Sequence, residues 1–249
     1  MRWPDLWHNL PWWARVLTIA AAGRLISTVI LLFFAQAQAA NAWTGASPSY
    51  PEFASLWDGR WYEIVAFSGY PAELPRTVDG HVAENAWAFM PVYPAVVRVV
   101  MGLSGLDWAT AAVVVSILAT LAASLVFYRL MRLALDESTA LFSVVIFSVA
   151  PLSPILQVAY AESLHVLLLA GALYLVLTRH YLAAFPVIAV MCFTRPSGLA
   201  FALFLTLHVL VRWFRRRSSG DTLRDLVPPF VLAVSAACLA SPGRRSPGR

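Results

Sequence analysis

Long apolar runs, separated by short polar or basic segments, make up most of the chain. A helix needs roughly 20 apolar residues to cross the ~30 Å hydrocarbon core of a bilayer. Runs near this length predict transmembrane spans at residues 16–34, 109–127, 138–158, 164–177, 182–193 and 199–211, with a further candidate at 226–239. The pattern is typical of an all-α polytopic integral membrane protein in which residues 1–240 form a single transmembrane domain.

Two stretches depart from this pattern. Residues 36–90 are polar overall and contain several prolines and glycines, which predicts an outer loop of short helices and turns. Pro91 and Pro94 then open an apolar run that ends near Leu106. This run is short for a span, so we expect residues 91–106 to be re-entrant or interfacial.

The composition supports a membrane protein and argues against nucleic acid as a partner. Hydrophobic residues make up 60% of the chain and charged residues 12%, against a usual charged share of about 25% in soluble domains. The net charge of +5 comes from basic residues beside apolar runs, which indicates membrane topology. Cys192 and Cys238 lie in apolar surroundings without metal-ligand spacing, so we expect neither a disulfide nor a metal site.

The arginines predict the orientation of the chain. Arg2 and Arg15 precede the first span and a dense basic run occupies 212–217, so these ends are expected in the cytoplasm. The polar motifs then lie on the extracytoplasmic side, of the cell membrane if the protein is bacterial. If residues 91–106 cross, the later orientation inverts. A signal peptide cleaved near 35–40 is the alternative for the first span, but the spans that follow favour a retained anchor.

Arg24 lies inside the first predicted span. A charged side chain at such a place either extends back to the cytoplasmic surface or pairs with a phosphate or carboxylate within the bundle. We expect Arg24 to extend to the surface.

The outer loop contains one stretch in which charges stand among aromatic residues. Asp58 and Arg60 are flanked by Trp57, Trp61 and Tyr62. In a helix the two tryptophans share one stripe, and Asp58 and Tyr62 share the next. Aromatic faces stack on sugars and a carboxylate can take a proton from a hydroxyl, so the stretch suits a sugar-handling site with Asp58 as the catalytic residue. The alternative is an interfacial belt of aromatic residues with solvated charges.

Two further polar motifs stand at predicted helix starts. Glu162 follows a double-proline break and either caps the next helix or belongs to the site. Arg195 lies just before Pro196, where the helix dipole opposes a cation, so it needs an anionic partner or water. A phosphate is one candidate, because a guanidinium binds two oxygens at once, and lipid head groups are the other.

Four stretches, in this order, resemble the motifs of the PIG-V family, which comprises GPI mannosyltransferase 2 and its bacterial relatives. They lie at residues 57–62, 89–94, 160–163 and 194–198, and the resemblance covers residues 10–215. The resemblance implies a GT-C-type transmembrane bundle with a large first extracytoplasmic loop. It also implies a catalytic acidic residue in that loop and a polyprenyl-phosphate-linked mannose donor.

The resemblance suggests an inverting mannosyltransferase with a glycan or glycolipid acceptor in a membrane-lipid environment. Asp58 is then the general base, and Arg195, with Arg60, holds the phosphate. No cofactor is evident, and a divalent cation at Asp58 is left open. The other expected substrate-binding residues are Trp57, Trp61, Tyr62, Tyr93, Tyr160, Glu162 and Ser163.

Two alternatives remain open at this stage, a transporter or lipid-binding membrane protein and an inactive fragment. Charged motifs at helix ends on one side, without an internal repeat, favour an enzyme over a transporter. Residues 241–249 have no apolar content and are expected to form a disordered tail. PIG-V proteins carry further transmembrane helices beyond this region, so we expect the chain to be truncated.

Overall fold

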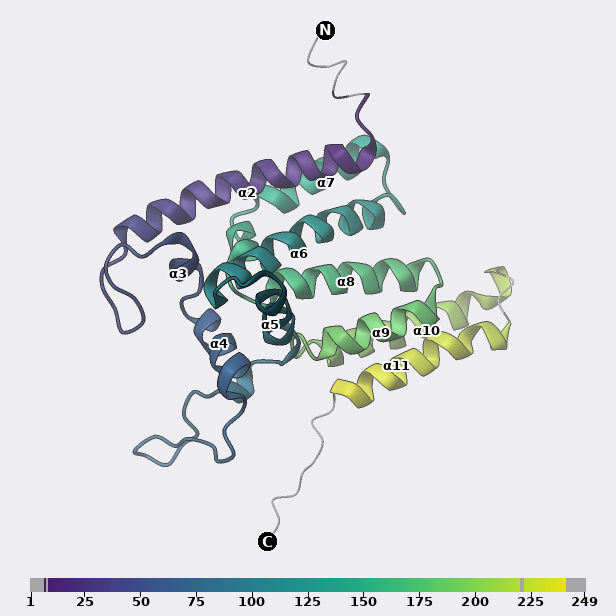
Figure 1. Cartoon of the computed structure of the whole chain (residues 1–249). Helices are drawn as coiled ribbons and strands as arrows, with labels where there is room; N and C mark the ends of the chain where they lie inside the picture. Colours follow the sequence, from purple (N-terminus) through teal and green to yellow (C-terminus); the bar gives the residue numbers. More distant parts are fainter. Residues whose placement is uncertain (1–6, 8, 220–221, 241–249) are drawn as a thin grey trace.

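The computed structural model describes residue 7 and residues 9–219 and 222–240, so the predicted tail at 241–249 and Arg2 lie outside the described residues. The α-helices are α2 (Trp12–Ala37), α3 (Tyr50–Ala54), α4 (Asp58–Ser68), α5 (Val92–Ser104), α6 (Trp108–Met131), α7 (Glu137–Val149), α8 (Glu162–Leu177), α9 (Tyr181–Cys192), α10 (Gly198–Ser219) and α11 (Val227–Ala240). Short 3₁₀ helices are η1 (Ala86–Ala88), η2 (Ser153–Gln157) and η3 (Leu223–Leu226). Figure 1 shows the long helices lying side by side.

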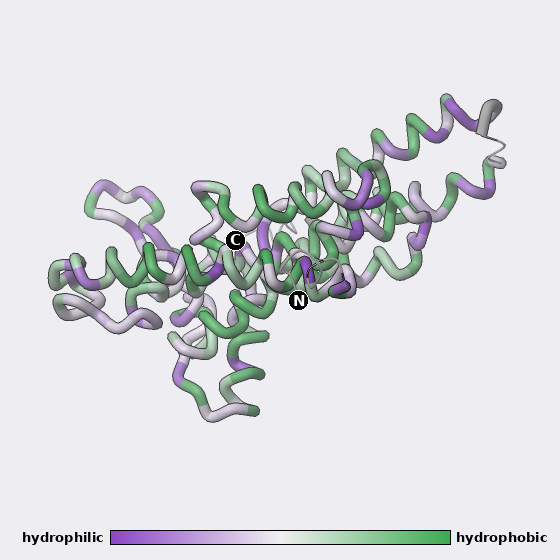
Figure 2. Tube along the Cα trace, turned by 90° about the horizontal axis from the view of Figure 1, so that it is seen from above, coloured by the Kyte–Doolittle hydropathy of each residue, from purple (hydrophilic) through white to green (hydrophobic). Residues whose placement is uncertain are grey.

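Within the described residues, three helices are long and apolar enough to cross a membrane, namely α2, α6 and the 198–216 part of α10. Apolar side chains of α2 face outward, with Leu25 69%, Val29 67% and Phe33 68% exposed. Hydrophobic colour runs along the helices in Figure 2. A large apolar outer surface suits lipid rather than water. The prediction of an α-helical membrane protein is confirmed at this level.

Helices occupy the ranges predicted as spans, with one difference in extent. In the range 138–158, α7 ends at Val149 and η2 follows, so the double-proline break expected there is confirmed. The helix predicted at 199–211 continues to Ser219. The other ranges, 16–34, 109–127, 164–177, 182–193 and 226–239, are helical throughout or nearly so in α2, α6, α8, α9 and α11.

Arg24 is buried at the break after α7, so the expectation that it extends to the surface was wrong. Pro151 has no N–H, and carbonyl groups near the break lose helical donors. Arg24 replaces these donors, with Nη1 2.7 Å from the Ser153 carbonyl oxygen and Nη2 3.0 Å from that of Ser148. A Cβ at Gly23 would lie 2.6 Å from the same Ser148 oxygen, so glycine permits this close approach of α2.

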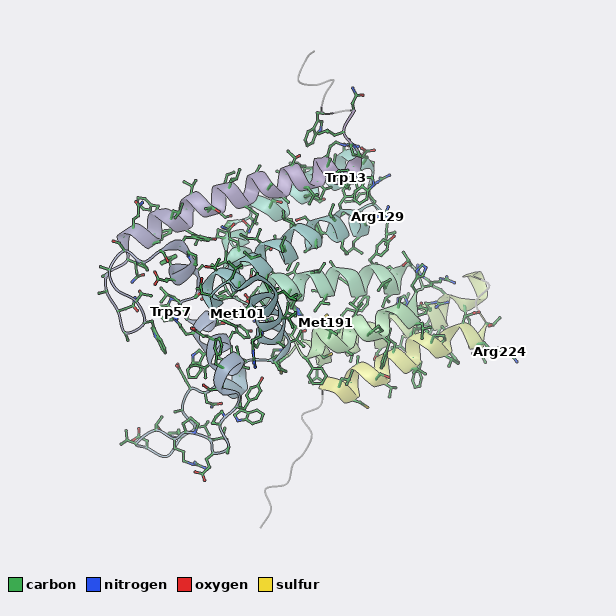
Figure 3. All side chains as sticks on the ribbon, viewed as in Figure 1. Trp13, Trp57, Met101, Arg129, Met191 and Arg224 are labelled. Atoms are coloured by element: carbon green, nitrogen blue, oxygen red, sulfur yellow. The ribbon has the colours of Figure 1, made fainter. Side chains whose placement is uncertain are left out.

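Neighbouring helices meet with their arginine-bearing ends together. The Arg129 guanidinium, near the end of α6, lies 5.0 Å from the ring centroid of Trp12 at the start of α2. Arg15 of α2 forms an ion pair with Glu137 at the start of α7. In Figure 3, Arg129 and Trp57 lie at opposite ends of the bundle. The basic ends of these helices are therefore remote from the first predicted motif.

One apolar cluster joins the outer loop to the bundle. It buries Tyr62 of α4 and Tyr93 of α5 together with Ala111 and Ala112 of α6, and Leu164 of α8 packs against it. Small side chains allow helix backbones to approach closely, which brings the aromatic rings of α4 and α5 against α6. The cluster fixes the loop helices relative to the start of α8.

The polar loop consists of short helices and turns, as predicted. Ser49 and Glu52 form a capping box at the start of α3. Between α4 and η1, Arg76 and Val82 form an isolated bridge around Gly80, whose φ of 81° suits a residue without a Cβ. The bridge closes residues 76–82 into a hairpin-like turn within the loop.

The helix α5 runs across the bundle rather than along it. In Figure 1 it is seen nearly end-on, whereas α2, α6 and α8 run across the view. Pro91 precedes the helix and Pro94 lies in its first turn, where a missing N–H is tolerated. Val99 is 61% and Leu103 86% exposed. Residues 92–104 therefore form a short helix that crosses its neighbours, and the interfacial or re-entrant position expected for residues 91–106 stays a prediction.

Candidate functional site

Asp58 is the first residue of α4, and the residue before it has an unusual backbone. Trp57 has φ 58° and ψ −118°, a conformation that is strained for a residue with a Cβ. The Leu56 carbonyl accepts hydrogen bonds from the Gly59 N–H at 3.2 Å and the Tyr160 hydroxyl at 3.1 Å. These bonds hold the turn, which leaves Trp57 79% exposed beside a half-buried Asp58.

The segment before α5 packs on α4 through aromatic rings. The Phe89 ring stacks on Trp61 with a centroid distance of 5.8 Å and meets Tyr62 edge-on at 5.1 Å. Tyr62 also meets Tyr93 edge-on at 5.1 Å. The Tyr93 side chain is fully buried, and its hydroxyl donates to a backbone carbonyl of α6 at 3.1 Å. Tyr93 thus supports Tyr62 from within the bundle and is not open to a ligand.

The third and fourth motifs meet in an ion pair between Glu162 and Arg195. The Arg195 side chain is 37% and the Glu162 side chain 20% exposed. Next to them, the Val92 N–H donates to the Phe193 carbonyl at 3.2 Å, which ties the start of α5 to the end of α9. The four stretches that resemble family motifs therefore lie together at one end of the bundle.

The carboxylates of Asp58 and Glu162 act on two tyrosines, Tyr62 and Tyr160. Burial raises the pKa of Tyr62, the carboxylates of Glu162 and Asp58 raise it further, and the Arg195 guanidinium opposes them. Burial also raises the pKa of Tyr160 to about 12, with the Asp58 carboxylate acting in the same direction. Both hydroxyls stay protonated at neutral pH and remain hydrogen-bond donors.

Three buried polar atoms at the start of α8 have no hydrogen-bond partner within the described part of the chain. They are Glu162 Oε2, Ser163 Oγ and His165 Nδ1. Buried polar atoms are normally paired, so this turn is suited to polar ligand groups or water. His165 was not predicted from the sequence. His165 lies three residues after Glu162, and residues at this spacing are neighbours on one face of a helix. This spacing is the signal that could have identified it.

Asp58 lines a pocket of about 300 Å³ between α4 and the segment before α5. Its walls are formed by Trp57, Asp58, Trp61, Glu84, Asn85, Ala88 and Phe89. Glu84 and Asn85 were not predicted as site residues, because only the folding of the loop brings them to α4. The Glu162–Arg195 pair does not line this pocket. The site therefore has an acidic, aromatic part and a separate ion-paired part.

Arg60 is engaged elsewhere. Its Nη1 donates to Glu63 at 2.8 Å and its Nη2 to the Trp43 carbonyl at 3.3 Å. Glu63 is three residues further along α4, where helical side chains are neighbours. Arg60 was expected to help Arg195 hold the phosphate. In the structure its guanidinium is instead paired with Glu63.

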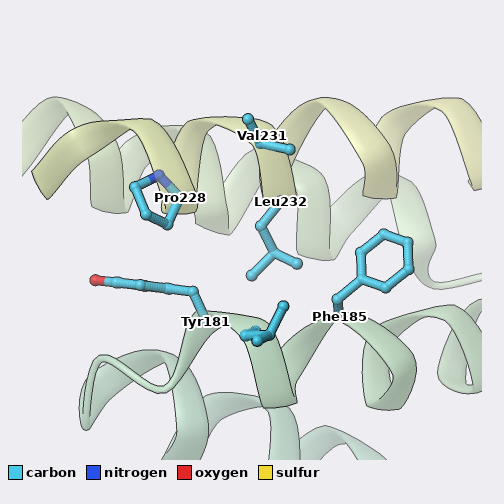
Figure 4. A pocket seen from close by; sticks show the side chains of 6 residues that line it. Tyr181, Phe185, Pro228, Val231 and Leu232 are labelled. Atoms are coloured by element: carbon cyan, nitrogen blue, oxygen red, sulfur yellow. The ribbon is translucent and has the colours of Figure 1, made fainter. Parts of the chain in front are cut away.

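A mainly apolar cavity, separate from the Asp58 pocket, lies between α9 and α11 (Figure 4). It measures about 340 Å³ and is lined by Tyr181, Leu182, Phe185, Pro228, Val231 and Leu232. Its walls carry no carboxylate and no basic group. Among the described residues, no group of three or more His, Cys, Asp or Glu could hold a metal ion. The candidate chemistry is therefore concentrated around Asp58, Glu162 and Arg195.

The chain matches no protein-family model, no curated protein and no solved structure. What it does must be argued from its residues and their arrangement.

Proposed function

We propose that the protein is an inverting mannosyltransferase that moves mannose from a polyprenyl phosphate to a hydroxyl of a glycan or glycolipid. The observation that carries the proposal is the convergence of the four PIG-V-like stretches, 57–62, 89–94, 160–163 and 194–198, through the contacts of Phe89, the Tyr160–Leu56 hydrogen bond and the Glu162–Arg195 pair. Four stretches without a common function would not be expected to contact one another in the folded chain. The bundle then corresponds to a GT-C-type fold.

In this proposal Asp58 is the general base. Its pocket carries a second carboxylate, Glu84, and no basic side chain, which suits a neutral hydroxyl-bearing acceptor. Asp58 takes the proton of the acceptor hydroxyl while the hydroxyl oxygen attacks the anomeric carbon of mannose. The bond from that carbon to the phosphate oxygen breaks, and the lipid phosphate leaves with the electron pair. A single displacement inverts the configuration.

Arg195 binds the donor phosphate and stabilises the charge that develops on it as it leaves. Its guanidinium is partly exposed and is held by Glu162, so it is positioned before the phosphate arrives. Tyr62 is influenced by the Asp58 and Glu162 carboxylates and by the Arg195 guanidinium, and its hydroxyl stays protonated.

We place this reaction on the extracytoplasmic face, at the cell membrane if the protein is bacterial. Support comes from the position of Arg15 and Arg129, which lie together at the end of the bundle remote from Trp57. Arginines at helix ends favour the cytoplasmic side.

Mannosyl transfer by the purified protein in liposomes tests the proposal. Radiolabelled mannose is supplied either as polyprenyl phosphate mannose or as a nucleotide-linked mannose, with mono- and oligosaccharides as acceptors. We expect transfer from the lipid donor alone, into a product whose anomeric configuration is opposite to that of the donor. Transfer from the nucleotide donor alone, retention of configuration, or no transfer from either donor would each contradict the proposal.

A further inference from the structure

A second pocket adjoins the Asp58 pocket. It measures about 290 Å³ and shares Trp61, Glu84 and Asn85 with it. The remaining walls of this second pocket are formed by Ile64, Ser68, Gly69, Tyr70, Pro71, Pro75 and Ala86. Because Trp61, Glu84 and Asn85 line both pockets, the two pockets lie next to each other along α4, and the pair is called the groove below.

The loop between Tyr70 and Trp87 is held at both ends, and these contacts fix the shape of the groove. The Tyr70 and Trp87 rings stack with a centroid distance of 4.6 Å. The Tyr70 hydroxyl donates to the Phe89 carbonyl at 2.8 Å, and Trp87 Nε1 donates to the Pro71 carbonyl at 3.0 Å. A wall held in this way loses little conformational entropy when a ligand binds.

The chemistry of the walls selects the kind of ligand. Asp58 and Glu84 supply two carboxylates, and neither pocket is lined by an arginine, lysine or histidine. An anionic group is disfavoured between two carboxylates, whereas hydroxyl groups can donate to them. Aromatic surface from Trp61 and Tyr70 is available to the apolar faces of a sugar ring. A neutral, hydroxyl-rich ligand fits both pockets.

We propose that the second pocket is an acceptor subsite, and that the acceptor is an oligosaccharide chain of at least two sugar rings. The ring that receives mannose lies in the pocket beside Asp58, and the preceding ring lies beyond Trp61 against Tyr70. Each pocket is close to the lower size limit of small-molecule sites, which is about 300 Å³. One ring in each therefore uses the whole groove. The inference rests on the proposed function and adds the minimum length of the acceptor.

Binding of matched saccharides, without donor, tests the subsite apart from turnover. The probes are methyl mannoside against mannobiose and N-acetylglucosamine against its β-linked dimer, measured by calorimetry on the purified protein. Ser68→Phe fills the second pocket from its exposed rim, and Thr77→Phe places the same ring at an exposed position of the same loop that lines neither pocket. Thermal unfolding checks that both variants are folded.

We expect the parent protein to bind one of the disaccharides roughly tenfold more tightly than its monosaccharide, because the second ring adds one contact with an aromatic side chain. Ser68→Phe should remove this preference while keeping monosaccharide binding, and Thr77→Phe should retain it. Equal affinity for both lengths in every pair, or a preference that survives Ser68→Phe, overturns the subsite. A lack of mannosyl transfer with a length preference still present would refute the proposed reaction and leave the subsite in place.

Discussion

The Tyr160 hydroxyl donates a 3.1 Å hydrogen bond to the Leu56 carbonyl, which joins the start of α8 to the turn before Asp58. Tyr160→Phe removes this bond and should lower the free energy of unfolding by about 1 kcal/mol. Turnover should fall as well, because Asp58 loses part of its support. Thermal unfolding and mannosyl transfer measure the two effects. Tyr174→Phe in α8 is the matched control, because the Tyr174 hydroxyl has no hydrogen bond within the part of the chain that the structure describes.

The contribution of Tyr160 to the free energy of unfolding should depend on pH in a defined direction. The pKa of Tyr160 is raised from 10 to about 12 in the folded protein, first by burial. A raised pKa means that the protonated hydroxyl stabilises the fold below pH 10 and that this stabilisation is lost as the pH rises toward 12. The stability difference between the parent and Tyr160→Phe should therefore be constant from neutral pH to pH 9 and shrink above pH 10, as measured by chemical denaturation. A difference that grows above pH 10 would show the opposite linkage.

Arg24 offers a test of the polar contacts inside the bundle. Arg24→Met leaves the Ser148 and Ser153 carbonyls without their guanidinium donors, and should lower the free energy of unfolding by roughly 2–4 kcal/mol. Arg76→Met, which removes an exposed bond to the Gly80 carbonyl, should have a much smaller effect. Thermal unfolding in detergent measures both. Equal stability of Arg24→Met and the parent would mean that other groups satisfy these carbonyls.

The proposed orientation can be tested with single cysteines. Cys192 and Cys238 are first replaced by alanine, and cysteine is then introduced at exposed Ser49 or exposed Ser138. Ser49 precedes α3 in the outer loop and Ser138 lies at the start of α7, beside the arginine-bearing ends. A membrane-impermeant thiol reagent applied to intact cells should label position 49 and not position 138. The reverse labelling would place the Asp58 site in the cytoplasm.

Much of the helical framework could be predicted from the sequence, because long apolar runs leave few alternatives in a membrane protein. The break after α7 could also be predicted, because Pro151 and Pro154 interrupt the apolar run and a proline lacks the N–H that a helix needs. The burial of Arg24 follows from that break and required the facing carbonyls of Ser148 and Ser153 to be known.

The candidate site was predictable to a different degree. Asp58, Glu162 and Arg195 could be singled out because charges in aromatic or apolar surroundings stand out in the sequence. Arg60 could not be separated from them, because its pairing with Glu63 is decided by side-chain geometry within α4. Glu84 reaches the Asp58 pocket only through the folding of the loop, which no local pattern reveals.

Arg195→Lys tests whether the guanidinium binds the donor phosphate. Lysine keeps the charge and loses the second point of contact, so KM for polyprenyl phosphate mannose should rise about tenfold or more while KM for the acceptor changes little. Arg98→Lys, at an arginine that donates to the Ala66 carbonyl, is the control and should leave both constants near the parental values. An equal rise in both constants for Arg195→Lys would indicate a general structural role instead.

The most direct test of the account is turnover by Asp58→Asn. If Asp58 takes the acceptor proton, this isosteric change should reduce kcat by about 10²- to 10⁴-fold, the contribution of a positioned base. Donor binding and the unfolding temperature should stay near the parental values, and Asp79→Asn, an exposed carboxylate of the same loop, should retain full turnover. Near-parental turnover by Asp58→Asn would contradict the account and leave Glu84 as the carboxylate of that pocket to test next.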